Sequence, residues 1–210
     1  PLPPMRPAQD VLDVSRLYEA LHDTTLHHVR LISGADYTLS GPRAAAALAE
    51  LCSPPRESLT LEGVGALPPH VRFTPPTNGV RIACAVRLVH LNVTLDAPAA
   101  IRVDPGGILT LAGGAQIDGL LENRGVVRYE LPAPLGTHVS GGAVRSCTEE
   151  AGLCSAAAGD GAFLVELRGS PTEPEVVSGL PQPCAAGYLG SSSSLAAQRR
   201  STCSHACPKG

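Results

Sequence analysis

Five charged residues have the types and spacing that acid–base chemistry or calcium binding needs: Asp96, Asp104, Asp118, Arg102 and Arg124. Paired carboxylates can act as general acid and base, or as oxygen ligands of Ca²⁺. Asp96 and Asp118 are 22 positions apart, so they can lie on neighbouring turns of a repetitive fold. Each aspartate, however, stands beside Ala-Pro, Pro-Gly or Gly, where Asp is favoured for hydrogen bonds within a turn. We therefore expect solvated turn residues and no catalytic site.

A second group has the composition of a metal site, since His22 and Asp23 are followed closely by His27 and His28. Adjacent residues on a strand point to opposite faces, so only one of His27 and His28 can join a given site. No matching cluster of Cys and His occurs near them in the sequence. We expect an exposed helix end that leads into a sheet edge, and no bound metal or other cofactor.

Near the C-terminus, Cys203 and Cys207 flank His205, a spacing that also occurs in zinc knuckles. Cys184 opens the same segment and is followed by Gly187. The segment has almost no apolar side chains, so it needs a covalent link to be ordered. We expect a disulfide-bonded repeat here.

Seven cysteines and the sequon Asn92-Val93-Thr94 are typical of a protein that passes through the secretory pathway. If Cys207 belongs to a following repeat, six cysteines remain, and several connectivities are open. Proximity favours two of the following pairs and leaves the third: Cys184–Cys203, Cys147–Cys154 and Cys52–Cys84. The alternative for the third pair is two free buried thiols. We predict an extracellular or cell-surface location, with glycosylation at Asn92.

The composition argues against several classes of partner. Aromatic residues make up 3% of the chain, Trp is absent, the net charge is −3, and Lys209 is the single lysine. Stacking surfaces for bases and a basic stripe are therefore both missing, which argues against nucleic acid. No apolar stretch reaches the roughly 18 residues that span a bilayer, so we expect contact with a membrane only through a larger parent protein.

Short stretches of alternating apolar and polar residues predict the strands that position the candidate residues named above. They are residues 29–31, 59–61, 80–82, 101–103, 127–129 and 163–167. Leu61, Ile82 and Val103 follow one another at intervals of 21 positions, and Leu88 and Leu109 repeat that interval. This period predicts stacked turns that share an apolar column. Leucine-rich repeats have a similar period, but their asparagine ladder is missing, so we favour a parallel β-helix.

Two helices are expected near the start. Asp13 can cap a helix over residues 14–21, in which every third or fourth residue is apolar and forms one stripe. The alanine-rich residues 44–51 predict a second helix within an insertion at 44–55. We expect the first helix to cover one end of the stack.

Residues 10–39 resemble the start of right-handed β-helices of the pectin-lyase type, in which a capping helix leads into a coil with the pattern apolar-x-Leu-x-x-Gly-x-Tyr-x-Leu. Residues 59–65 and 100–111 resemble later coils of that family, so the resemblance covers roughly 10–130. It implies a right-handed parallel β-helix. Lyases of the family use Asp ligands for Ca²⁺ with an Arg base, and its hydrolases use paired Asp. The hydrolase triplets Asn-Thr-Asp and Gly-His-Gly do not occur in this chain.

Residues 184–210 resemble the ephrin-receptor-like cysteine-rich repeat, which occurs in tandem in large surface proteins. The last four residues, Cys207-Pro208-Lys209-Gly210, repeat the Cys-x-x-Gly opening of that unit. We expect a second unit and a longer extracellular parent. The bias toward Ala, Gly, Pro and Arg resembles that of surface proteins of green algae.

Together these observations predict an all-β chain with a short N-terminal capping helix. A β-helix domain is expected at 1–182, clearest over 24–130, and a cysteine-rich repeat at 183–210. The expected function is that of a non-catalytic spacer or docking block in an extracellular assembly such as a cell wall, a ciliary surface filament or an adhesive ectodomain. Its partners would be other extracellular proteins, copies of itself or glycans. The alternative is a carbohydrate-binding β-helix or a degenerate polysaccharide lyase.

Overall fold

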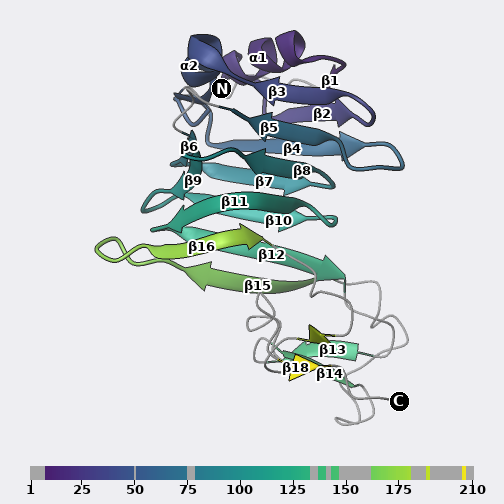
Figure 1. Ribbon diagram of the computed structural model, residues 1–210. Helices are drawn as coiled ribbons and strands as arrows, with labels where there is room; N and C mark the ends of the chain where they lie inside the picture. Colours follow the sequence, from purple (N-terminus) through teal and green to yellow (C-terminus); the bar gives the residue numbers. More distant parts are fainter. Residues whose placement is uncertain are drawn as a thin grey trace, which may run out of the picture.

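The computed structural model describes residues 8–49, 51–74, 79–132, 137–140, 143–146, 162–180, 188–189 and 205–206 (Figure 1). Most of these residues belong to strands. Two short helices, α1 (Val14–His22) and α2 (Gly41–Ala49), lie at the N-terminal end. The all-β class predicted from the alternating pattern is therefore confirmed.

The strands form two large open sheets in which most neighbours are parallel. The first sheet contains, in spatial order, β1 (Gln9–Val11), β2 (His28–Ile32), β4 (Ser58–Val64), β7 (Ala85–Val89), β10 (Ile108–Ala112), β12 (Val126–Pro132) and β15 (Ala162–Arg168). The second contains, in spatial order, β3 (Asp36–Leu39), β5 (His70–Phe73), β8 (Asn92–Leu95), β11 (Gln116–Asn123), β9 (Ala100–Val103) and β6 (Gly79–Ile82), and β16 (Glu175–Leu180) pairs with β11. All six strands predicted from alternation lie within this set.

Successive strands form layers, where one layer is one passage of the chain through both sheets. The first layer is β2, β3 and α2, the second β4, β5 and β6, the third β7, β8 and β9, and the fourth β10 and β11. The long β11 has two halves, because residues 116–118 pair with β8 and residues 120–123 pair with β9. Gly119 joins the halves at φ +142, and a Cβ there would lie 2.5 Å from the Cβ of Leu95. The bend between the halves thus requires glycine.

The predicted interval of 21 residues holds for only part of the stack. Ile82 pairs with Val103 in the second sheet, as the interval predicted. Leu61, in contrast, lies in the first sheet and pairs with Leu88, 27 positions further on. The alignment of Leu61 with Ile82 was therefore wrong, although Leu61, Ile82 and Val103 pack into one hydrophobic core.

The predicted alignment of Leu88 with Leu109 was also wrong. Leu88 pairs with Leu111, and Leu109 pairs with Val86. The connections between strands differ in length from layer to layer, so a constant interval misplaces strands that follow a long connection. Side-chain alternation alone does not tell which of the two sheets a strand will join.

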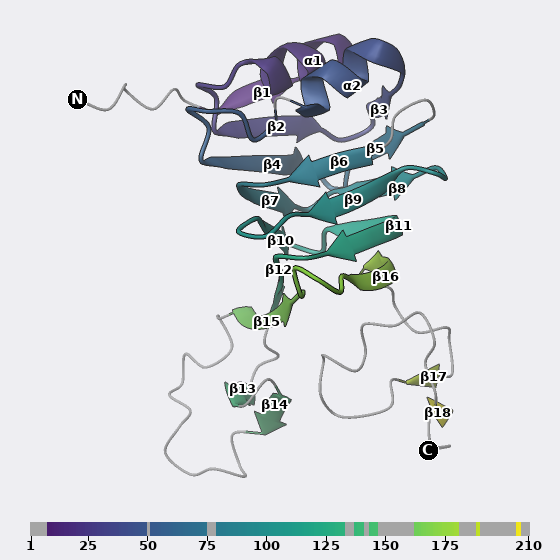
Figure 2. The same cartoon turned by 90° about the vertical axis from the view of Figure 1, so that its left-hand side faces the viewer.

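Helix α1 covers the N-terminal end of the stack (Figure 2). Asp13 caps it, and its side chain accepts a hydrogen bond of 2.9 Å from the backbone N–H of Arg16. The stripe predicted from the sequence is buried over Leu17, Tyr18 and Leu21. The capping helix is therefore confirmed, and it satisfies its own backbone hydrogen bonds while it covers the core.

Helix α2 takes the place that a strand of the second sheet occupies in later layers, next to β6. It begins at Gly41, three residues before the predicted start, and ends at Ala49. Ala44, Ala47 and Leu48 are buried against the core. Its alanines allow close approach to its neighbours, because they add little bulk.

At the C-terminal end the direction of the chain reverses. β15 pairs antiparallel with β12, and β16 pairs antiparallel with β11. These two strands follow the last parallel layer in both sheets (Figures 1 and 2).

The core between the sheets consists mainly of aliphatic side chains, which come from every layer. It encloses an apolar cavity of about 40 Å³, whose lining includes Phe73, Ile82 and Leu88. A cavity without polar partners stays dry. The interior therefore serves packing and does not offer a polar binding site.

Two small strand pairs complete the described structure. β13 (Thr137–Ser140) and β14 (Ala143–Ser146) form an antiparallel pair, and so do β17 (Tyr188–Leu189) and β18 (His205–Ala206). The second pair lies within the predicted cysteine-rich segment. Five cysteines lie outside the described residues, so the pairs predicted for them remain predictions: Cys147, Cys154, Cys184, Cys203 and Cys207.

Candidate interaction surface

The outward side chains of the strands form three faces. The first face belongs to β2, β4, β7, β10 and β12. The second belongs to β3, β5, β8 and residues 116–118, and the third to β6, β9 and residues 120–123. Because alternate residues of each strand point into the core, the remaining residues determine the chemistry of these faces.

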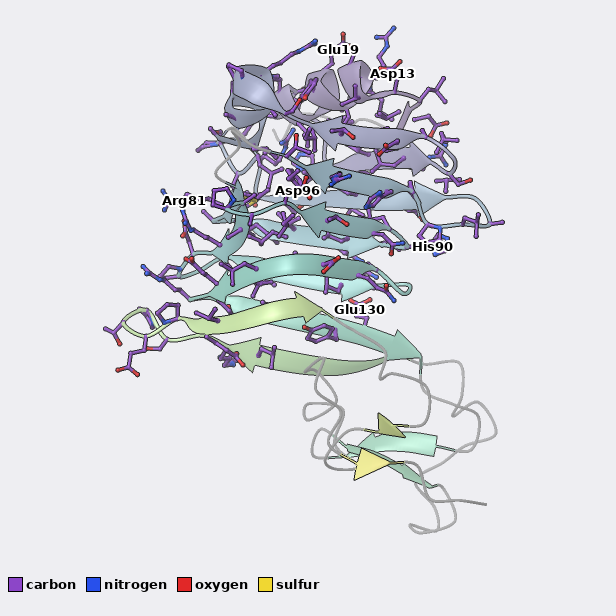
Figure 3. The ribbon with its side chains drawn as sticks, in the orientation of Figure 1. Asp13, Glu19, Arg81, His90, Asp96 and Glu130 are labelled. Atoms are coloured by element: carbon purple, nitrogen blue, oxygen red, sulfur yellow. A yellow bond between two sulfur atoms is a disulfide. The ribbon has the colours of Figure 1, made fainter. Side chains whose placement is uncertain are left out.

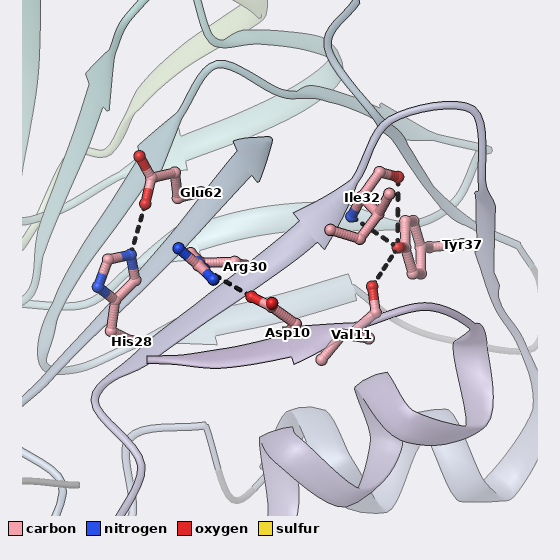
Figure 4. A network of polar contacts seen from close by, with 7 residues as sticks. All are labelled: Asp10, Val11, His28, Arg30, Ile32, Tyr37 and Glu62. Atoms are coloured by element: carbon pink, nitrogen blue, oxygen red, sulfur yellow. Dashed lines mark hydrogen bonds and ion pairs between the residues drawn. The ribbon is translucent and has the colours of Figure 1, made fainter. Parts of the chain in front are cut away.

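On the first face, ion pairs link strands of different layers. Arg30 donates to Asp10 at 2.6 Å, and His28 lies 2.8 Å from Glu62 (Figure 4). The hydrogen bond from Arg30 is the largest cause that lowers the pKa of Asp10 below its ordinary value of 3.8. These contacts hold β1, β2 and β4 together at the solvent side of the sheet.

The longest contact on the first face passes over a whole strand. Arg87 on β7 forms two hydrogen bonds to Glu130 on β12, of 3.0 and 2.6 Å. Strand β10 lies between them, and its Thr110 is only 9% exposed although it points outward. The ion pair thus spans β10 and joins layers that are not neighbours.

The second face carries amide, hydroxyl, imidazole and carboxylate groups. Arg72 binds both carboxylate oxygens of Asp96, at 3.0 and 3.1 Å, and this contact raises the pKa of Arg72. His70 Nε2 lies 2.8 Å from Thr94 Oγ1. A shallow hollow of about 300 Å³ lies on this face, lined chiefly by His70, Asn92, Thr94, Gln116 and Asp118.

The third face carries a column of charges. Arg81 and Arg102 are direct register partners in β6 and β9, and Arg102 is in turn the partner of Glu122 in β11. Arg81 donates to Asp104 at 2.7 Å, and Arg102 donates to Glu122 at 3.1 Å. The Arg81 side chain is 75% exposed and lies on the opposite side of the molecule from His90 (Figure 3).

The structure distributes the residues considered for acid–base chemistry over two faces and places Asp96 and Asp118 on the same one, in neighbouring layers. Asp96 follows β8 on the second face and Asp104 follows β9 on the third, and each binds an arginine of the layer before it. Asp118 lies on the second face, where its register partner is Thr94. Arg102 pairs with a glutamate, and Arg124 is exposed at the turn that follows β11.

The histidines considered for metal binding have separate partners. His28 lies against Glu62, and His27 Nδ1 lies 3.0 Å from the backbone oxygen of Ser58. Asp23 accepts hydrogen bonds from Thr25. Among the residues that the structure describes, no group of three His, Cys, Asp or Glu side chains is arranged to hold a metal ion. The side chain of His205 is not among the described ones.

Cys52 and Cys84 form a disulfide, with their Cα atoms 5.3 Å apart. This is the third of the three pairs predicted from the sequence, so the disulfide is confirmed and the alternative of two free thiols was wrong. Cys52 follows α2, and Cys84 lies at the corner between β6 and β7. The backbone N–H of Cys84 also donates to Cys52 Sγ at 3.1 Å. The disulfide therefore ties the segment after α2 to the corner that follows β6.

A groove lies between α2 and β6, the terminal strand of the second sheet. Its volume is about 590 Å³. The helix side presents the exposed Ala45 and Ala49, and the strand side presents Arg81, Arg102 and Asp104. The groove therefore combines small apolar residues with a charged wall.

Three buried residues with polar groups have structural roles that the sequence analysis did not predict. Arg56 is 2% exposed, and its guanidinium donates to the backbone oxygens of Ala20, Leu21, Leu51 and Asp23. Backbone oxygens at helix ends have no partner within the helix, and a cation there is favoured by the helix dipole. No local sequence pattern predicts this role, because the carbonyl groups that Arg56 binds lie up to 36 positions away from it.

The other two residues are Tyr37 and Asn123. The Tyr37 hydroxyl accepts from the N–H of Ile32 at 3.0 Å and donates to the backbone oxygen of Val11 at 2.7 Å (Figure 4). Burial is the main cause that raises the pKa of Tyr37. Asn123 is fully buried, donates to the backbone oxygen of Leu167 and accepts from the N–H of Gly125. Asn123 directly precedes an Arg-Gly turn, and this position could have indicated an asparagine whose side-chain amide bonds to the backbone of the turn.

In the described part of the chain, neither helix has the length and apolar character needed to cross a membrane. Comparison with protein-family models, with curated proteins and with solved structures found no match for this chain. The interpretation of its function therefore depends on the chemistry of the three faces and of the groove.

Proposed function

We propose that this chain is a right-handed parallel β-helix of the pectin-lyase type that acts as a non-catalytic spacer or docking block. The alternation of the strands between two parallel sheets supports the architecture. Right-handed connections are the rule for parallel strands joined by crossovers, which supports the handedness. Stacked layers resist bending because each layer pairs along its length with the next.

The observation that carries the non-catalytic role is the way the charged side chains are used. Asp96, Asp104 and Glu122 each hold an arginine of a neighbouring strand, so their carboxylates neutralise a cation within the protein. A general acid and base need instead two carboxylates that face the same substrate atom. This arrangement favours a role in which the outer faces stabilise the stack and contact partners.

We also propose that the parent is a large secreted or cell-surface glycoprotein. The Cys52–Cys84 disulfide is favoured by an oxidising compartment. Asn92 lies on the second face, where an attached glycan would project from the sheet. Residues 183–210 would continue the chain as ephrin-receptor-like repeats into an assembly with other extracellular proteins or with further copies of this chain.

The test of this proposal measures the release of unsaturated uronic acid from pectin and polygalacturonate, with and without Ca²⁺, at high protein concentration. We expect no release by the wild type and no difference between it and an Asp96→Asn, Asp118→Asn double variant. Light scattering on the same samples records self-association. Turnover that disappears in the double variant would overturn the non-catalytic role.

A second candidate is carbohydrate binding without turnover, and the hollow on the second face favours it. Asn92, Gln116 and Asp118 offer amide and carboxylate groups of the kind that hydrogen-bond sugar hydroxyls. Calorimetric titration with oligogalacturonides tests it, with Gln116→Ala as the variant that should weaken binding. Equal binding by both proteins would rule out the hollow as the site.

A further inference from the structure

The hollow on the second face lies around the sequon itself. Asn92 and Thr94, the first and third residues of the sequon, line it from β8. Gln116 and Asp118 line it from β11, where they are the register partners of Asn92 and Thr94. A group attached to the side chain of Asn92 therefore begins within the hollow.

The polar side chains on the two sides of Asn92 differ in whether they already have partners. On the β5 side, His70 Nε2 lies 2.8 Å from Thr94 Oγ1, so these two groups engage each other. On the β11 side, Gln116 and Asp118 are exposed, and their side chains form no hydrogen bond or ion pair within the described part of the chain. These groups lie about one strand spacing, about 4.8 Å, from β8. Hydrogen-bonding capacity that the fold leaves unused is thus found on the β11 side of Asn92.

The charge and the size of the hollow restrict what can fill it. The lining contains the carboxylate of Asp118 but neither arginine nor lysine. An anionic ligand would be repelled by this carboxylate, whereas the hydroxyl groups of a neutral sugar can donate to it. The volume of about 300 Å³ is at the lower end of the usual range for ligand sites, which suits a small neutral occupant.

We propose that the hollow binds this chain's own glycan, so that the first N-acetylhexosamine on Asn92 lies toward β11 and hydrogen-bonds to Gln116 and Asp118. Attachment forms a bond between C1 of the sugar and Nδ2 of Asn92. It breaks the bond between C1 and the oxygen of a lipid-linked diphosphate donor. The diphosphate leaves with the electron pair of that bond, and the proton that Nδ2 loses passes to solvent.

The covalent link explains how so shallow a hollow can hold a sugar. A free sugar loses its translational and rotational freedom when it binds, and a few exposed polar groups compensate poorly for that cost. A sugar already joined to Asn92 has lost most of this freedom, so its effective concentration at the hollow is high. In the glycosylated protein the hollow is therefore filled and closed to free oligosaccharides.

The inference rests on the proposed glycosylation of Asn92 and deepens it, and the two can fail separately. A chain secreted without a sugar at Asn92 would overturn the glycosylation itself. A sugar that is attached but does not contact β11 would overturn only its place in the hollow. Neither result would change the outcome of the uronic acid assay.

The experiment uses the 210-residue chain secreted from eukaryotic cells and trimmed with an endoglycosidase to a single N-acetylglucosamine, whose position mass spectrometry confirms. The unglycosylated reference is Asn92→Gln from the same cells. We expect the trimmed protein to have a Tm about 3 °C higher than the reference, because the sugar adds hydrogen bonds across two layers. NMR of the trimmed, isotope-labelled protein should show nuclear Overhauser effects between the sugar and the side-chain amide of Gln116.

A matched pair of variants makes the result specific. Gln116→Ala, introduced into both proteins, should remove most of the Tm difference between them. Asp36→Ala should leave that difference unchanged, because Asp36 is exposed on the same face but does not line the hollow. Equal Tm values for the trimmed protein and Asn92→Gln, or a Tm difference that Gln116→Ala leaves intact without any Overhauser effect to Gln116, would overturn the proposal.

Discussion

The two ends of the strand stack are closed in different ways. At the N-terminal end, α1 and α2 cover the core, and the Arg56 guanidinium and the Cys52–Cys84 disulfide hold the helical segments in place. At the C-terminal end, β15 and β16 run against the last parallel strands and continue the backbone hydrogen bonding. The C-terminal end is thus covered by strands that pair directly with the two sheets.

The difference shows which side chains each kind of end cover requires. A helical cover needs side chains that bind its free carbonyl groups, because the sheet cannot reach them. An antiparallel cover is bonded along its whole length and needs few such side chains. We therefore expect single substitutions to damage the N-terminal end more than the C-terminal end.

The largest effect is expected from Arg56→Met. The methionine fills similar space but leaves the carbonyl groups of Ala20, Leu21 and Leu51 without their donor. Loss of hydrogen bonds from a buried charged group should lower the free energy of unfolding by about 3 kcal/mol or more. Urea unfolding measures this loss.

The matched control for Arg56 is Arg16→Met, because Arg16 is an exposed arginine that pairs with Glu19 in α1. A change of less than about 0.5 kcal/mol is expected there. If both variants lost the same amount, Arg56 would have no special role at this end.

The next effect is expected from removing the disulfide in a Cys52→Ala, Cys84→Ala double variant. The bond closes a loop with a sequence separation of 32, and such a loop is worth about 2–4 kcal/mol in most proteins. Thermal unfolding should show a lower Tm. Hydrogen exchange should increase first in α2 and β6, since the bond links these segments, and an increase confined to β12–β16 would contradict this assignment.

A smaller effect compares the two ends directly with Tyr37→Phe and Asn123→Ala. The Tyr37 side chain bonds to backbone groups of Ile32 and Val11, and the Asn123 side chain bonds to backbone groups of Leu167 and Gly125, so each substitution should cost about 1–3 kcal/mol. Hydrogen exchange should rise in β1–β3 for the first variant and in β15 and β16 for the second. A rise spread evenly over the chain would show that the ends are not independent.

The smallest effect is expected from Asp10→Asn at the outer edge of the first sheet. The folded protein lowers the pKa of Asp10 below 3.8, mainly through the hydrogen bond from Arg30. The stability from this contact is therefore present above the unfolded pKa and lost as the pH falls through the lower, folded value. The Tm difference between wild type and variant should shrink below pH 4, and a difference that grows in acid would contradict the sign.

The sequence allowed the strands and the helical cover to be predicted, but not their register. Alternation located residues 80–82 and 101–103, which pair as predicted. It missed β3, β5 and β8, although polar and apolar residues alternate in each of them as they do in β6. Leu61 was assigned to the wrong column because the chain covers 27 positions before it returns to the same sheet.

The sequence predicted the local setting of single surface residues, but not which side chains they contact. The aspartates were interpreted as turn residues, and Asp96 and Asp104 do follow the ends of strands. Their arginine partners lie more than 20 positions earlier, on strands whose register had to be known first. The groove beside β6 was beyond prediction for the same reason, since it exists only because a helix replaces a strand in the first layer.

The reversal of chain direction at β15 and β16 restricts how a longer version of this protein can arise. Ala85 and Ile108 are register partners, so a tandem copy of residues 85–107 begins and ends at equivalent points. Such a duplication adds one layer, about 4.8 Å thick, between two layers whose strands run in the same direction. A copy appended after β16 would lie next to a strand that runs in the opposite direction. Growth, by gene duplication or by engineering, is therefore confined to the interior of the stack.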